Sequence, residues 1–422
     1  MVNKHEIVIT GVGVVSSIGI GTEPFWDSLC NGRTGIRSLT PADHPYQPTP
    51  FGGEVADFDP KQYVRPRKSL KVMSREIQLA FAAADFAGAD AALDKHPVDS
   101  ERLGVIFGSD MIPCELPELT TVYRECIVDG RFDFDRWGAA AMSTMYPLWM
   151  LKYLPNMPAC HIGIARDARG PNNSITTGDV SSLLAMAEAV SVLERGQADT
   201  IIAGGAGSRI HPVTLVRVRA IGLSKRNDAP TAACRPFDAG RDGMVMGEGA
   251  GSWIMETRGH AESRGVTPLA RVLGVSAAFE PVHNRQMPKG TALRRAMETA
   301  RLKAGLTPND IGCVIAHGAS LPDDDRIEAT AIRAALGDVP VTAPKSYFGH
   351  LGAASGALET VLGVLMLRHK LVPATLNYEV PDPQCPINVV HGDAMPLERP
   401  AVLLLSYTRQ GHAAAVVLGQ AD

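Results

Sequence analysis

The segment at residues 170–205 reads GPNNSITTGDVSSLLAMAEAVSVLERGQADTIIAGG and decides the fold that we expect. Residues 173–177 are rich in β-branched side chains and predict a strand, as do residues 199–203, while the mostly apolar residues 180–194 predict a helix. Strand, helix and strand in this order form a parallel βαβ unit. The sharp Gly178-Asp179 turn places the aspartate at the N-terminus of the helix, where the helix dipole favours negative charge and where many enzymes hold a nucleophile.

Composition narrows the class of protein. The 422 residues are enough for two α/β units with an ample core. A formal net charge of −4 gives no support to nucleic-acid binding, which usually accompanies a basic surplus. The seven cysteines are an odd number without a CxxC pattern, which predicts reduced thiols, and no apolar run approaches the roughly 20 residues of a membrane span. These features predict a soluble, cytoplasmic protein that binds neither nucleic acid nor membrane.

Strand-like and helix-like segments alternate along the whole chain, which predicts mainly parallel sheets with helices on their faces. A break near residues 251–267 divides this pattern into two α/β halves, residues 1–255 and 256–422. The first half carries insertions at about 38–70 and 110–155.

Three further sites lie on turns that follow predicted strands: His317, Lys345 with His350 five residues on, and residues 407–411. Each alone has an ordinary structural explanation. Together they are more informative, because side chains at equivalent strand ends converge on one pocket, here with Asp179. The acidic run at residues 323–325 predicts an exposed loop and no metal site.

Ordered motifs along nearly the whole chain carry a family resemblance. They are VITGVGVVSSIG at residues 8–19 and the motifs at residues 156–171, 235–251, 316–318, 345–359 and 372–377. With this set the chain resembles the elongating β-ketoacyl-acyl-carrier-protein synthases of the thiolase superfamily. The resemblance implies an α/β, five-layer αβαβα fold, built from two similar βαβαβ halves and usually dimeric.

In the family that the chain resembles, a cysteine at a helix N-terminus takes an acyl chain from the carrier protein, and two histidines, a lysine and a glutamate support the chemistry. The resemblance assigns the supporting roles to His317, His350, Lys345 and Glu359. The nucleophile position falls on Asp179, and none of the seven cysteines replaces it. No bound cofactor or metal is implied, and the phosphopantetheine arm of an acyl carrier protein is the expected substrate carrier.

Three other positions depart from the family pattern. Ala319 and Leu321 stand where the family has threonines that hydrogen-bond the pantetheine arm, and Arg409 stands in the place of a gating phenylalanine. The position of the nucleophile, the residues that bind the pantetheine arm and the gating residue therefore all differ from the family pattern. Because a carboxylate is a far weaker nucleophile than a thiolate and would form a hydrolysable anhydride, condensing activity is doubtful.

The leading hypothesis is a non-condensing homologue that resembles a chain-length factor and pairs with a Cys-containing ketosynthase as a heterodimer, or with itself as a homodimer. On this hypothesis we expect Asp179 to be charged and held in an ion pair, with Lys345, the histidines or Arg409 as its neighbours. A second hypothesis is a malonyl-carrier decarboxylase or thioester hydrolase that uses Asp179, His317 and His350. The third is an active condensing synthase with an atypical site.

Overall fold

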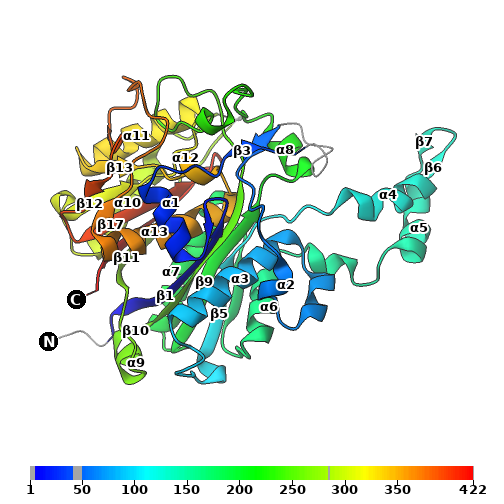
Figure 1. The fold of residues 1–422 in the computed structure, drawn as a ribbon, viewed down its shortest axis with the longest axis horizontal. Coiled ribbons are helices and arrows are strands. Elements are labelled where there is room, and N and C mark those ends of the chain that lie inside the picture. The colour runs from blue at the N-terminus through cyan, green and yellow to red at the C-terminus, as the bar shows by residue number, and fades with distance from the viewer. Residues whose placement is uncertain (1–4, 41–49, 284–285, 422) are drawn as a thin grey trace.

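The computed structural model describes residues 5–40, 50–283 and 286–421. Its main sheet is one continuous path of hydrogen-bonded strands (Figure 1). In spatial order the strands are β15 (Asn388–Val389), β13 (Pro340–Thr342), β12 (Ile311–Ile315), β17 (Ala401–Tyr407), β18 (His412–Gln420), β11 (Ala270–Phe279), β1 (Ile7–Ser16), β10 (Glu248–Thr257), β9 (Thr200–Ser208), β5 (Leu103–Gly108) and β8 (Asn172–Ile175).

The directions of these strands correct the expectation of mainly parallel sheets, because the sheet is mixed. β5 runs parallel to β8 and β9, and β12 runs parallel to β13 and β17. The long central strands β1, β10, β11 and β18 pair antiparallel. β17 and β18 are joined by a tight turn with no crossover helix, and such a connection makes neighbouring strands antiparallel.

Helices cover the sheet in layers, as the five-layer αβαβα expectation requires (Figure 1). Helices α7 (Ser181–Glu194) and α13 (Ser355–His369) form the middle layer, where α13 is buried from Ser355 to Leu367. The outer layers are α3 (Arg75–Asp90) with α6 (Met157–Ala165), and α10 (Thr291–Lys303) with α11 (Pro322–Leu336). The predicted βαβ unit at residues 170–205 is confirmed as β8, α7 and β9.

A long excursion leaves the body of the molecule between β5 and α6. It carries α4 (Leu116–Glu125), β6 (Ile127–Val128), β7 (Arg131–Phe132) and α5 (Trp137–Thr144), and it projects as an arm in Figure 1. The other predicted insertion, at about 38–70, includes residues 41–49, which lie outside the described residues. Its described part holds β4 (Phe51–Gly52) and α2 (Pro60–Tyr63).

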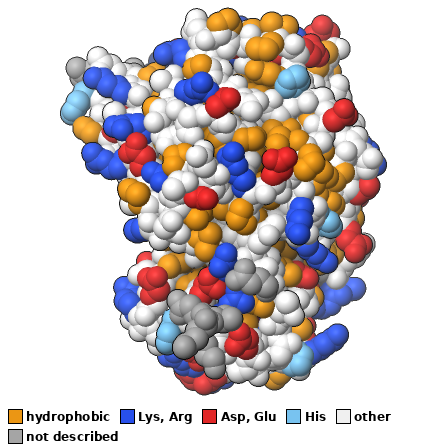
Figure 2. Space-filling model, turned by 90° about the vertical axis from the view of Figure 1, so that its left-hand side faces the viewer, with side chains coloured by type: hydrophobic (Ala, Val, Ile, Leu, Met, Phe, Trp, Pro, Cys, Tyr) orange, Lys and Arg blue, Asp and Glu red, His pale blue; other side chains and the backbone are white. Residues whose placement is uncertain are grey.

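Short elements complete the chain: α1 (Thr22–Cys30), α8 (Pro212–Val218), α9 (Arg258–Ser263), α12 (Lys345–Phe348), β2 (Gly19–Ile20), β3 (Arg37–Ser38), β14 (Leu371–Val372) and β16 (Met395–Pro396). Among the helices within the described ranges, none combines the length and the apolar character that a bilayer crossing needs. Acidic and basic side chains are interspersed on the face drawn in Figure 2, with hydrophobic side chains gathered toward its middle.

Candidate functional site

Asp179 lies on the turn between β8 and α7. Gly178 adopts a φ of +62°, which the absence of a Cβ makes accessible, and residues Gly178–Val180 form one 3₁₀ turn before α7 begins at Ser181. The Ser181 hydroxyl closes the turn, accepting from the Thr177 amide at 2.9 Å and donating to the Gly178 carbonyl at 2.6 Å. The Ser406 hydroxyl on β17 donates to the Asp179 carbonyl at 2.8 Å, which ties the turn to the opposite layer.

The Asp179 carboxylate is held by a cation that sequence reasoning did not identify. Its Oδ1 lies 2.9 Å from Nη2 of Arg209, the residue directly after β9. The same Nη2 lies 2.8 Å from Oδ2 of Asp110, so one nitrogen bridges two carboxylates. An ion-paired Asp179 was expected, but the expectation that named Arg409 among its partners was wrong.

Arg409 instead forms a bidentate ion pair with Asp324 on α11, at 2.9 Å from Nε to Oδ1 and 2.5 Å from Nη2 to Oδ2. The reason is positional: the β17–β18 turn that carries Arg409 lies against the first turn of α11. This also corrects the expectation that residues 323–325 form an exposed loop. They form the first turn of α11, where acidic side chains suit the helix dipole, and Asp324 and Asp325 are buried.

The two histidines face each other across the cavity, with ring centroids 5.3 Å apart and planes at 83°. His317 follows β12, and the carboxyl group of Glu328 accepts from the amides of His317 at 2.6 Å and Gly318 at 2.8 Å, which fixes this turn. His350 follows α12, and its Nε2 lies 3.6 Å from Oδ2 of Asp179.

The hydrogen bonds assign the tautomer of each imidazole. Nδ1 of His350 accepts from the Gly352 amide at 3.2 Å, and Nδ1 of His317 lies 3.4 Å from the Lys345 ammonium, which can only donate. In the neutral rings the proton is therefore on Nε2. Burial lowers the pKa of His350 to about 3 and that of His317 well below its usual value, so both are uncharged N–H donors at neutral pH.

Lys345 and Glu359 form a buried pair behind His317. Nζ of Lys345 lies 2.5 Å from Oε1 of Glu359 and donates to the His317 carbonyl at 2.5 Å. Strand β13 ends at Thr342, and Lys345 is the first residue of α12.

Asp179 keeps its negative charge in this setting. Burial alone raises its pKa, but attraction to His350, Arg209 and Lys345 outweighs burial and leaves the pKa below its usual value. Since His350 is uncharged at neutral pH, the attraction there comes from Arg209 and Lys345, of which Arg209 is in direct contact with the carboxylate.

A cavity of about 450 Å³ opens between these groups. The predicted residues Asp179, His317, His350, Ala319, Leu321 and Arg409 all line it, while Lys345 and Glu359 lie behind it. Ala319 and Leu321 belong to an apolar cluster with Val218 and Met244. The chemical roles of the predicted residues stay predictions. Sequence reasoning missed Arg209, Asp110 and Asp324; for the first two the available signal was their position just after β9 and β5.

Asp179, His317 and His350 also invite comparison with a metal site, since one ligand atom of each lies within 4.8 Å of the others. A metal needs an unprotonated ring nitrogen. The Gly352 amide donates to Nδ1 of His350, and the Lys345 ammonium faces Nδ1 of His317. In each neutral ring the proton is therefore on Nε2, the nitrogen that faces the cavity. The hydrogen-bonding pattern therefore fits two N–H donors, and it does not fit two metal ligands.

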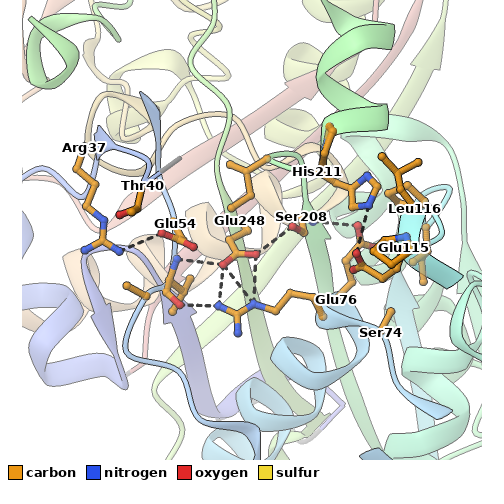
Figure 3. Close-up of a pocket in the computed structure, with 18 of the residues that line it drawn as sticks. Arg37, Thr40, Glu54, Ser74, Glu76, Glu115, Leu116, Ser208, His211 and Glu248 are labelled. Carbon is orange, nitrogen blue, oxygen red and sulfur yellow. Dashed lines mark hydrogen bonds and ion pairs between the residues drawn. The ribbon is translucent and has the colours of Figure 1, made fainter. Parts of the chain in front are cut away.

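A second, larger cavity of about 1070 Å³ is lined by Glu76, Ser208 and Glu248, among others (Figure 3). Ser208 and Ile210 line this larger cavity, while Arg209 lines the histidine cavity. The charges of the larger cavity are largely paired within it: Glu248 accepts from the Ser208 hydroxyl at 2.9 Å and from Arg75 at 2.8 Å. Burial raises the pKa of Glu76 to about 8, so this carboxyl is mostly protonated at neutral pH.

Two protein-family models and several known proteins match most of this chain. The family model "Beta-ketoacyl synthase, N-terminal domain" matches residues 4–261, and "Beta-ketoacyl synthase, C-terminal domain" matches residues 269–379. The chain is similar to the 3-oxoacyl-[acyl-carrier-protein] synthase 2 of Coxiella burnetii, with 32% identity covering 99% of each chain. It is also 34% identical to a putative polyketide beta-ketoacyl synthase 1 of Streptomyces cyaneus, covering 98% of each.

Among solved structures, the ishigamide ketosynthase/chain length factor superposes with a TM-score of 0.84 at 27% identity, covering 99% of each chain. The fold expected from the sequence is thereby confirmed.

Proposed function

The chain belongs to the beta-ketoacyl synthase family of fatty-acid and polyketide biosynthesis, and from this premise we propose that it is a non-condensing subunit that pairs with an active ketosynthase. We further propose that it meets acyl groups on the phosphopantetheine arm of an acyl carrier protein and needs no bound cofactor.

The observation that carries the proposal is the state of Asp179. Its carboxylate stands at the helix N-terminus where the family resemblance places the nucleophile, and it is fixed by Arg209 at 2.9 Å. A carboxylate is a weak nucleophile toward a thioester, and engagement with a guanidinium weakens it further. An acyl-enzyme on Asp179 is therefore not expected, and condensation through such an intermediate is not expected either.

The arm between β5 and α6 supports pairing with another chain. It exposes large hydrophobic side chains, among them Phe134, Met142 and Met150. Clustered exposed hydrophobic groups of this kind mark interaction surfaces. β8 ends the described sheet path, so its outer edge offers backbone groups to another strand. The ketosynthase/chain length factor with the same fold makes a Cys-containing ketosynthase the proposed partner, with a second copy of this chain as the other outcome.

One observation favours the second function, malonyl-carrier decarboxylation or thioester hydrolysis. Both imidazoles direct an Nε2 proton into the cavity, and two converging N–H donors stabilise an oxyanion or enolate oxygen. Asp179 would then act as a base or as an electrostatic partner of His350. The third function, condensation at an atypical site, would require Asp179 to accept the acyl group.

The test is to incubate the purified chain with malonyl- and acetyl-loaded acyl carrier protein, alone and with a Cys-containing ketosynthase, and to follow the carrier by mass spectrometry. We expect intact thioesters with the chain alone and condensation products only in the mixture. Release of carbon dioxide or loss of thioester by the chain alone would overturn the subunit proposal in favour of the second function.

A matched pair of variants assigns the role of Asp179. We expect product formation in the mixture to survive Asp179→Ala, and to survive the control Asp199→Ala, which removes a remote aspartate paired with Arg102. Loss of product with Asp179→Ala but not with Asp199→Ala, in protein that still folds and pairs, would give Asp179 a chemical role.

A further inference from the structure

The lining of the histidine cavity carries an unbalanced negative charge. Among the described residues, the Asp and Arg side chains that line the cavity are three carboxylates and two guanidiniums: Asp110, Asp179, Asp324, Arg209 and Arg409. The Arg409–Asp324 pair is bidentate and self-contained. The remaining excess is located on the group formed by Asp110, Arg209 and Asp179, called here the carboxylate bridge.

A glycine leaves the space that the carboxylate bridge occupies. A Cβ on Gly352 would lie 2.1 Å from Nε and 2.5 Å from Nη2 of Arg209, so the guanidinium occupies space that any side chain at position 352 would need. Because one nitrogen, Nη2, serves both carboxylates, the cation cannot turn away from either one without losing a contact. The negative excess is thus a built part of the cavity.

Besides Arg209, the described polar groups close to Asp179 within the cavity are the uncharged donors of His317 and His350. The ligand atoms of His317, His350 and Asp179 lie within 4.8 Å of one another, and both imidazoles present N–H groups. An acyl carbonyl oxygen that accepts from these donors therefore lies beside the Asp179 carboxylate. If the acyl group itself carries a carboxylate, one or two bonds beyond the carbonyl carbon, that carboxylate would lie within a few ångströms of the negative charge of Asp179.

We propose that this cavity selects uncharged acyl thioesters and rejects carboxylated ones such as malonyl, with Asp179 as the discriminating residue and Arg209 as the residue that positions it. The selection rests on the proposed function insofar as the ligand is a pantetheine thioester. Repulsion between two carboxylates about 6 Å apart, in surroundings between water and a protein surface, corresponds to a preference of about threefold to one hundredfold.

The experiment measures binding of acetyl and malonyl analogues of pantetheine, in which an amide nitrogen replaces the thioester sulphur, to the full chain by calorimetry. We expect the acetyl analogue to bind the tighter of the two, with the ratio of dissociation constants falling as salt is raised. In Asp179→Asn the ratio should fall toward one. In the control Asp199→Asn, where the altered aspartate pairs with Arg102 away from the cavity, the ratio should stay at the wild-type value.

Equal or tighter binding of the malonyl analogue to the wild-type chain, or binding of neither analogue at millimolar concentration, would overturn the proposal. So would an unchanged ratio in folded Asp179→Asn. If that variant does not fold, Asp110→Asn replaces it, because the Asp110 side chain is more exposed and its substitution should disturb the fold less. We expect Asp110→Asn to lower the ratio of dissociation constants by a smaller amount. The binding experiment uses this chain alone. Its ratio of dissociation constants can therefore be read even if the mixture with a ketosynthase and acyl carrier protein gives no condensation product.

Discussion

The two sides of the histidine cavity are stabilised in different ways. On one side, Lys345 and Glu359 have side chains that are 1% and 0% exposed, and they hold His317 from behind. On the other, Asp179, Arg209 and Asp110 are 21%, 17% and 37% exposed, and their side chains are joined by ion pairs through Nη2 of Arg209. A buried pair is costly to alter because the surviving partner loses its compensation, whereas a partly hydrated group can recover solvent. Substitutions at Asp179, Arg209 or Asp110 should therefore destabilise the fold less than substitutions at Lys345 or Glu359.

The largest effect should come from breaking the buried pair. Lys345→Met leaves Glu359 without a counter-charge and should lower the free energy of unfolding by about 3–5 kcal/mol, measured by urea denaturation. The exposed Lys303→Met should change it by less than about 0.5 kcal/mol. The double variant Lys345→Met/Glu359→Leu should recover most of the loss; a single variant as stable as Lys303→Met would contradict the comparison.

As the pH falls, the free energy of unfolding should decrease first because of His350. The pKa of His350 is about 3 in the folded chain and about 6.5 in an unfolded one, so below pH 6.5 the unfolded chain binds a proton that the folded chain does not. Stability is therefore lost as pH falls, by about 2 kcal/mol for this group between pH 7 and pH 5. Urea denaturation of His350→Gln across this range should show a correspondingly shallower pH dependence. A parallel pH dependence in wild type and variant would contradict it.

The carboxylate side should respond less, and at lower pH. Arg209→Met leaves Asp179 and Asp110 without their shared cation and should cost about 1–3 kcal/mol at pH 7, since both carboxylates keep some solvent. The depressed pKa of Asp179 supplies stability above about pH 4 that is lost as pH falls further. The difference between wild type and variant should therefore shrink below pH 4, whereas Arg209→Lys should retain part of the stability at pH 7.

Sequence reasoning found the members of the site that local pattern marks. Asp179, His317 and His350 each follow a strand-like segment with a glycine nearby, and their convergence is confirmed. Arg209 and Asp110 also follow strands, β9 and β5, but the sequence did not show that their side chains would meet Asp179. Their meeting depends on the side-by-side placement of β5 and β9 and on the missing side chain of Gly352, which are long-range properties.

The same reason explains the error over Arg409. Its neighbourhood to Asp179 was inferred from position along the chain, but the packing of the β17–β18 turn on α11 decides its partner. Strand direction was misjudged for a related reason, because alternation of strands and helices does not reveal which strands return without a crossover.

The smallest effect is expected at the rim. Arg409→Gln removes the charge that faces the buried Asp324, but the glutamine amide can still donate to that carboxylate and the arginine side chain is 31% exposed, so the loss should be about 1 kcal/mol. Hydrogen exchange should quicken at the amides of His412 and Gly411 in the turn. Exchange that is unchanged in this turn would show that the hydrogen bond from the Gly411 amide to the Thr408 carbonyl is enough to hold it.

The contact between Arg209 and Gly352 restricts the order in which substitutions can accumulate. Any side chain at position 352 would overlap the guanidinium, so Arg209 in its present place is compatible only with glycine there. In a lineage whose ancestor carried a larger residue at 352, the Arg209 guanidinium could take up its present contact with Asp179 only once position 352 had become glycine. Reversal is ordered too: Arg209 must be lost or displaced before position 352 can regain a side chain. The two positions therefore form a ratchet, and a reconstructed ancestor with Arg209 but without Gly352 should hold its arginine away from Asp179.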